Sequence, residues 1–164
     1  MPTRTMKILA LTLGVIGVVA GGAYAVHAQR QPAQPHVLAM DVYKTPTCGC
    51  CTKWVDHMRA AGFQVTARDV SQAELDTLKA KHGVPPAMHS CHTGLIDGYA
   101  IEGHIPAREV LRFLKERPAV AGLAVPGMPL GSPGMEVPGV TPRPYTVMTF
   151  DRAGQTQVFS TVKP

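Results

Sequence analysis

The sequence is poor in charged and aromatic residues. Charged residues make up 16% of its 164 positions and aromatic residues 5%, and lysine and arginine never form a run. An aromatic content this low does not suit a platform that stacks nucleic-acid bases. The formal charge of +5 includes Arg4 and Lys7, without which 14 basic residues stand against 11 acidic ones. This weak and scattered positive charge excludes nucleic acid as a partner.

Residues 1–28 carry the features of an export signal in the expected order. Arg4 and Lys7 give a positive start, a short apolar stretch follows, and small residues then occur at cleavage spacing. This order is typical of a signal peptide, so we expect cleavage and a periplasmic protein. Because the apolar stretch extends to Val26, the alternative is an uncleaved anchor in the inner membrane. Residues 29–36 are predicted to be a flexible lead-in.

Hydrophobic periodicity predicts alternating strands and helices over the rest of the chain. Short β-branched and aromatic runs indicate strands, and apolar residues at i, i+3, i+4 and i+7 indicate helices. Ser71 and Glu74 have the spacing of a capping box, and Asp97-Gly98 is a two-residue hairpin signal. The predicted elements are a strand over 37–43, a helix from Cys51 to Ala61, a strand over 63–67, a helix opened by Ser71 and ended by Gly83, a hairpin of 93–96 and 99–102, a helix from Pro106 that closes before Pro118, and a terminal hairpin of 145–150 and 155–161.

This order predicts a single α/β metal-binding domain over residues 37–164 with a thioredoxin-like fold. The chain is 45% hydrophobic, which is enough for one core. The first two strands are joined by a helix, so they should be parallel neighbours with a right-handed crossover. We expect a mixed four-stranded sheet flanked by helices, to which a Gly/Pro/Met-rich loop and a C-terminal β-hairpin are added.

Three of the four cysteines lie between the first predicted strand and the first predicted helix. They are Cys48, Cys50 and Cys51. The free amides and the dipole of the helix start favour negative charge, so thiolates form more readily there. Cys48 and Cys51 have the C-x-x-C spacing of a thioredoxin-type dithiol, which has no need of Cys50. Three crowded thiols in an oxidising compartment are better explained as metal ligands.

The fourth cysteine, Cys91, lies 40 residues after Cys51 at the entry of the predicted hairpin. In a thioredoxin-like fold this segment packs against the cysteine-rich turn. We therefore expect Cys91 to face Cys48 and Cys51 at close range and to complete a site of four thiolates. The alternative is two structural disulfides, because exported cysteines pair readily.

Histidine and methionine residues flank Cys91 and precede the third predicted helix. A lone histidine is more often a surface or core residue than a ligand, and we interpret His89 in that way. Met88, His92 and His104 remain second-tier candidates for the site.

Residues 122–139 are rich in glycine and proline and contain a short repeat. Pro-Gly-Met occurs twice at a spacing of seven and ends at Met128 and Met135. Apolar residues in this stretch indicate a loop that packs on the domain, which would deliver both methionines as thioether ligands that favour copper(I). The alternative is that the two side chains fill gaps under the loop.

Several motifs in order carry a resemblance to a known family. They are Thr45-Pro46-Thr47-Cys48-Gly49-Cys50-Cys51, Trp54-Val55-x-His57, Gly83-Val84-Pro85, Ser90-Cys91-His92-Thr93, Asp97-Gly98-Tyr99-x-x-Glu102-Gly103-His104-x-Pro106-Ala107, and the stretch from Gly122 to Glu136. From about Val42 to Phe159 the chain closely resembles the CopG-like periplasmic metal-binding proteins, a family long described as of unknown function and linked to copper resistance. The resemblance implies a thioredoxin-like fold and a copper site of Cys48, Cys50, Cys51 and Cys91, with the methionine loop and His104 nearby.

Three functions are consistent with these residues. The first is a periplasmic copper(I)-binding protein for copper resistance, which holds one or more copper ions and exchanges them with other copper-handling proteins. The second is a thiol–disulfide oxidoreductase in which Cys48 attacks and Cys51 resolves, and a redox-active copper site would combine the two. The third is a structural zinc site of the three clustered cysteines with Cys91 or His92. We rank zinc last, because C-x-C-C crowds its ligands on one turn.

Overall fold

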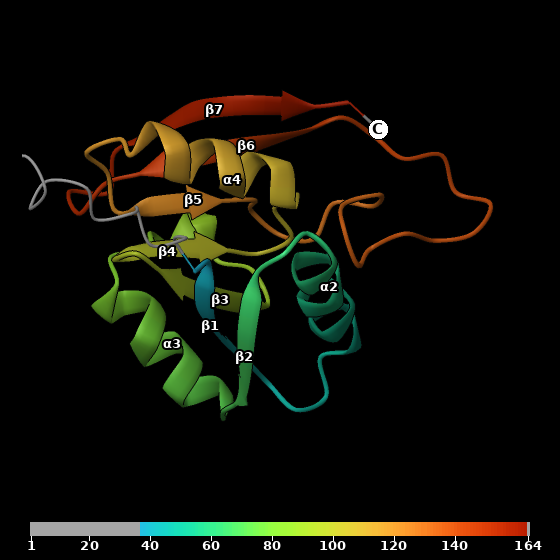
Figure 1. The fold of residues 1–164 in the computed structure, drawn as a ribbon, viewed down its shortest axis with the longest axis horizontal. Coiled ribbons are helices and arrows are strands. Elements are labelled where there is room, and N and C mark those ends of the chain that lie inside the picture. The colour runs from blue at the N-terminus through green and yellow to red at the C-terminus, as the bar shows by residue number, and fades with distance from the viewer. Residues whose placement is uncertain (1–36, 164) are drawn as a thin grey trace, which may run out of the picture. The chain divides into compact units, whose positions relative to one another are not determined.

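Seven strands form one mixed sheet in the computed structural model, which describes residues 37–163 (Figure 1). The sheet order is β2-β1-β3-β4-β5-β6-β7. The predicted export signal or anchor and the lead-in lie outside the described residues. The elements in chain order are β1 (Ala39–Lys44), α2 (Gly49–Ala60), β2 (Gln64–Asp69), α3 (Gln72–Lys81), the 3₁₀ turn η1 (Pro86–Met88), β3 (His92–Ile96), β4 (Tyr99–Glu102), α4 (Ala107–Glu116), β5 (Gly122–Ala124), β6 (Tyr145–Phe150) and β7 (Thr156–Val162).

The first half of the sheet follows the predicted topology. β1 and β2 are parallel neighbours joined through α2, and β3 pairs antiparallel with both β1 and β4. Asp97 and Gly98 both have positive φ, as the tight turn between β3 and β4 requires. Ser71 and Glu74 form the predicted capping box at the start of α3.

The expected four-stranded sheet is wrong, because the sheet has seven strands. β5 was not predicted; it is only three residues long and lies in the Gly/Pro-rich stretch. It pairs parallel with β4 and antiparallel with β6, so the predicted terminal hairpin of β6 and β7 continues the same sheet. A Cβ at Gly122 would lie 1.9 Å from the carbonyl oxygen of Ala100 and 2.8 Å from the ring of Phe150. Gly122 lacks the apolar side chain that would have indicated a strand in the sequence. The same lack of a side chain allows β5 to lie against Ala100 and Phe150.

Helices α2 and α4 contribute their apolar sides to the main core. Trp54 and Met58 of α2 and Val110 and Phe113 of α4 are completely buried there, with buried side chains from six of the strands. Ala100 of β4, Ala124 of β5 and Phe150 of β6 form a smaller cluster with Val84, which lies three residues after α3. Within residues 37–163, no helix is long and apolar enough to span a bilayer.

Candidate metal centre

Three cysteines occupy the first turn of α2. Cys48 is the N-cap residue, and its amide donates to the carbonyl of Thr45 at 3.1 Å, which closes the turn after β1. Cys50 and Cys51 follow within the helix. Cys51 is fully buried, whereas Cys48 and Cys50 are half-buried. The predicted position of the cluster, at the positive end of a helix dipole, is confirmed.

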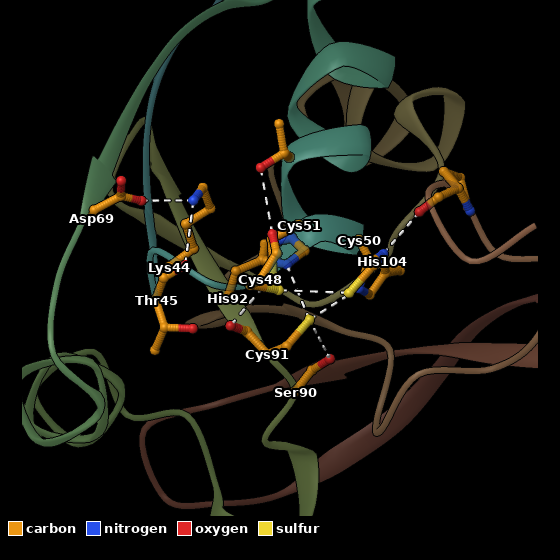
Figure 2. Close-up of a disulfide and its surroundings, with 12 residues drawn as sticks. Lys44, Thr45, Cys48, Cys50, Cys51, Asp69, Ser90, Cys91, His92 and His104 are labelled. Atoms are coloured by element: carbon orange, nitrogen blue, oxygen red, sulfur yellow. Dashed lines mark hydrogen bonds and ion pairs between the residues drawn. A yellow bond between two sulfur atoms is a disulfide. The ribbon is translucent and has the colours of Figure 1, made fainter.

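Cys91 faces this turn from the segment that enters β3. The four cysteine sulfur atoms all lie within 4.8 Å of one another. The Sγ of Cys51 also lies 3.6 Å from the carbonyl oxygen of Cys91, and Figure 2 shows the two segments meeting. The predicted convergence of four sulfurs from two distant stretches of chain is thus confirmed, while their role as ligands stays a prediction.

Two of the sulfurs are joined in a disulfide. Cys48 and Cys51 are bonded, with their Cα atoms 5.3 Å apart, and Cys50 and Cys91 are free thiols. The Sγ of Cys50 lies 3.5 Å from that of Cys48. The alternative of two structural disulfides is therefore wrong. The C-x-x-C pair is oxidised, and two thiols remain beside it.

His104 is oriented toward Cys91. Its Nε2 lies 3.0 Å from the Sγ of Cys91, and its Nδ1 lies 2.8 Å from the carbonyl oxygen of Pro133. A carbonyl only accepts, so Nδ1 carries the proton. Burial lowers the pKa of His104 below its ordinary value of 6.5, so the neutral ring directs the lone pair of Nε2 at the thiol. A backbone carbonyl on the second ring nitrogen is the usual support of a histidine metal ligand.

His92 lies deeper, between the rings of Trp54 and His104. The ring centroids are 4.3 Å and 5.0 Å apart, respectively. Its Nδ1 is 3.5 Å from the Sγ of Cys91, and its Nε2 is the buried side-chain polar atom for which the described residues offer no hydrogen-bond partner. Burial holds the pKa of His92 well below 6.5, so the ring is neutral. Cys51, Cys91, His92 and His104 thus form a second group whose ligand atoms lie within 4.8 Å.

The Cys91 thiol is protonated at neutral pH in this state. Burial raises its pKa to about 12, and the adjacent Cys50 thiol adds to the rise. The expectation that thiolates form readily therefore does not extend to Cys91, which faces the helix from another segment. A bound cation would have to displace this proton, so binding at Cys91 releases a proton.

The methionine loop reaches the site through its backbone. Pro133 and Gly134 are buried, and a Cβ at Gly134 would lie 2.6 Å from the carbonyl oxygen of Cys50. Met135 is half-buried, whereas Met128 is 50% exposed. The prediction that the loop packs on the domain is confirmed at Pro133 and Gly134, and the ligand role of the two thioethers stays a prediction.

The remaining candidates have packing or supporting contacts. Met88 packs against the smaller apolar cluster, and the Nε2 of His89 donates to the carbonyl of Val84 at 3.3 Å. Sequence reasoning missed two supports of the site. The indole nitrogen of Trp54 donates to the carbonyl of Ile105 at 2.8 Å, and the carbonyl of Pro133 binds His104. Side-chain patterns carry no signal for a backbone acceptor.

Comparison with known proteins places this chain beside two solved structures. The family described as "Protein of unknown function, DUF411" matches residues 88–135. A structure described as "Copper resistance protein copG", Form 1, is 44% identical with a TM-score of 0.72, and the match covers 79% of this chain and all of that one. Form 2 is 46% identical with a TM-score of 0.71, covering 78% of this chain and all of that one. A search of curated proteins found no match.

Proposed function

Because this chain belongs to the CopG family of copper resistance proteins, we propose that it binds copper(I) in the periplasm through the thiolates of Cys48, Cys50, Cys51 and Cys91. One observation carries the proposal. Four cysteine sulfurs converge at one helix start within 4.8 Å of one another, and the lone pair of His104 is directed at the sulfur of Cys91.

The donor set suits a soft cation. Thiolates select copper(I), zinc or iron–sulfur clusters, and an imidazole is compatible with the first two. The two groups of side chains that could hold a metal ion contain cysteine and histidine and no carboxylate, which favours a soft cation. The methionine loop lies beside the same turn, and Met128 and Met135 would add thioethers, which favour copper(I) over zinc.

The oxidation state of Cys48 and Cys51 sets how many ligands are available. The disulfide leaves Cys50, Cys91 and His104 as donors, and its reduction by an external dithiol, with two electrons and two protons, restores two thiols. In the reverse direction the two thiols release two electrons and two protons as the disulfide forms. That is enough to reduce two copper(II) ions to copper(I), so the same residues would serve a redox-active copper site.

Anaerobic loading tests the proposal. The protein is reduced, freed of reductant, given excess copper(I) and desalted, and its copper is measured per chain by mass spectrometry. We expect at least one tightly held ion and a clear loss in Cys50→Ser, while His89→Ala, a histidine with a packing role, serves as the control. Less than one ion per chain, unchanged in Cys50→Ser, would overturn the proposal.

The disulfide supports a second candidate, a thiol–disulfide oxidoreductase. Cys48 is half-buried and Cys51 fully buried, so an external thiol would attack the Cys48 sulfur and Cys51 would act as the resolving thiol. Reduction of a model disulfide protein that is abolished by Cys48→Ser would favour this function. Cys50 and His104 have no part in it.

We also propose that the fold is thioredoxin-like. The support is the parallel β1-α2-β2 unit next to the antiparallel β3 and β4, with the C-x-x-C pair at the start of α2. The proposal includes a periplasmic location, with an inner-membrane anchor if the export signal is retained, and its support is the signal-peptide pattern of residues 1–28.

A further inference from the structure

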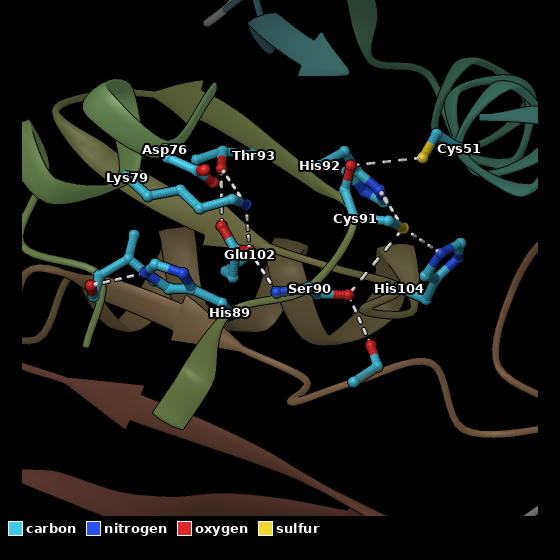
Figure 3. Close-up of polar contacts among 12 residues, drawn as sticks. Cys51, Asp76, Lys79, His89, Ser90, Cys91, His92, Thr93, Glu102 and His104 are labelled. Carbon is cyan, nitrogen blue, oxygen red and sulfur yellow. Dashed lines mark hydrogen bonds and ion pairs between the residues drawn. The ribbon is translucent and has the colours of Figure 1, made fainter. Parts of the chain in front are cut away.

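A buried ion pair lies next to the candidate metal centre and contributes no ligand atom to it. Lys79 of α3 and Glu102 of β4 are 1% and 0% exposed and are in direct contact. The Thr93 hydroxyl donates to the Glu102 carboxylate at 2.6 Å and accepts from the Lys79 ammonium at 3.0 Å. The carboxylate also accepts from the backbone amide of Ser90 at 2.6 Å, as Figure 3 shows.

Stability alone does not explain such a pair. Removing two charges from water is costly, and replacing a buried pair by apolar side chains is often neutral or stabilising. The pair therefore calls for a second role. What it adds here is a fixed acceptor for one particular backbone amide, that of the residue before Cys91.

Glu102 connects the two segments that carry Cys91 and His104. Its side chain binds Ser90, one residue before Cys91, and its own backbone lies two residues before His104. Gly103 between them donates its amide to the carbonyl of His92 at 3.1 Å. A Cβ at Gly103 would lie 2.6 Å from the Oγ of Ser90, so the two segments are in tight contact.

We propose that Glu102, with Lys79 as its buried counterion, is a positioning residue that holds Cys91 beside the Nε2 of His104. The inference rests on the proposed function for its consequence, copper(I) affinity, but its geometric part concerns the protein without metal. Lys79 neutralises the carboxylate, and the Ser90 amide is the group that the carboxylate fixes.

Two double variants distinguish the hydrogen bond that Glu102 accepts from Ser90 from the charges of Glu102 and Lys79. Lys79→Leu with Glu102→Gln removes both charges. The oxygen of the new glutamine side chain still accepts from the Ser90 amide, and its nitrogen donates to the Thr93 hydroxyl. Lys79→Leu with Glu102→Leu removes the charges and the acceptor. Should the second protein fail to fold, Lys79→Leu with Glu102→Asn replaces it, because the shorter amide falls short of Ser90.

Two measurements are made on each folded variant. Copper(I) affinity comes from competition with a chromophoric copper(I) chelator, and hydrogen exchange of the Ser90 and Cys91 amides is followed by NMR without metal. We expect the glutamine variant to bind like wild type. The leucine variant should bind about 10- to 100-fold more weakly, the usual effect of removing a ligand's support, with faster exchange at Ser90.

Equal affinity and equal Ser90 exchange in the leucine and glutamine variants would overturn the inference. If wild type itself binds no copper(I), the proposed function fails, and exchange at Ser90 and Cys91 alone then decides whether Glu102 positions this segment.

Discussion

The Nε2 of His104 and the Sγ of Cys91 lie 3.0 Å apart, and no other side-chain nitrogen in the described contacts lies closer to a cysteine sulfur. The orientation of the His104 ring is fixed on its other side, because its Nδ1 donates to the carbonyl of Pro133. The methionine loop therefore orients a histidine as well as carrying thioethers.

Two substitutions of His104 distinguish the role of its Nε2 from that of its Nδ1. His104→Asn keeps a donor near the Nδ1 position for Pro133 and removes Nε2, whereas His104→Gln keeps a polar group near Nε2 and removes the donor. If Nε2 is a ligand, we expect His104→Asn to weaken copper(I) binding at least about tenfold, measured by chelator competition. Wild-type affinity in His104→Asn, with His89→Ala as the unaffected control, would contradict a ligand role.

The disulfide should gate metal uptake. With Cys48 and Cys51 bonded, only Cys50 and Cys91 are free, so alkylation under denaturing conditions should label two cysteines before reduction and four after it. We expect the oxidised protein to hold less copper(I) per chain than the reduced protein. In the native oxidised protein Cys91 should react slowly at pH 8, because its pKa is raised to about 12. Equal copper content in both states would contradict the assignment of Cys48 and Cys51 as ligands.

The two Pro-Gly-Met repeats offer a matched pair of glycines. Gly127 and Gly134 have φ of +67° and +86°, so alanine at either costs about 1–2 kcal/mol of backbone strain. A Cβ at Gly127 meets nothing within 4 Å, whereas one at Gly134 meets the carbonyl oxygen of Cys50 at 2.6 Å. We expect Gly134→Ala to lower both the melting temperature and copper(I) affinity, and Gly127→Ala to lower the melting temperature alone. Equal copper(I) affinities in the two variants would contradict a role of the contact between Gly134 and Cys50 in the metal site.

Local patterns in the sequence predicted much of this geometry. The C-x-C-C turn and its helix follow from spacing, and the antiparallel β3 and β4 follow from Asp97-Gly98. Once those elements are placed, Cys91 has to enter the sheet beside the turn. The convergence of the sulfurs was therefore predictable without knowledge of the side-chain contacts.

The unpredicted features depend on groups with no side-chain signature. β5 is defined by a glycine that fits between Ala100 and Phe150, and His104 is oriented by the carbonyl of Pro133. Glu102 is also invisible to periodicity, since it is a charged residue at a core position whose partner, Lys79, is 23 residues away. The disulfide joins the C-x-x-C pair that spacing had identified as a thioredoxin-type dithiol, although the favoured metal site required all four cysteines as thiolates.

Acidification should destabilise the protein before its carboxylates titrate. Burial lowers the pKa values of His92, His104 and His57 in the folded state below 6.5, while the unfolded chain takes up protons near that value. The stability that comes from keeping these rings neutral is fully present above pH 6.5 and is lost as the pH falls toward the folded pKa values. We expect the urea midpoint of the metal-free protein to fall steadily between pH 6.5 and about 4.5.

His92→Phe identifies the main contributor to this pH dependence. Phenylalanine keeps an aromatic ring between Trp54 and His104 and removes the unpartnered Nε2. A buried polar atom without a partner costs about 1–3 kcal/mol, so the variant should be as stable as wild type at pH 7 or more so. Its urea midpoint should fall less steeply on acidification, because one proton fewer is taken up on unfolding. An unchanged slope would mean that His92 is not the group whose protonation the fold resists.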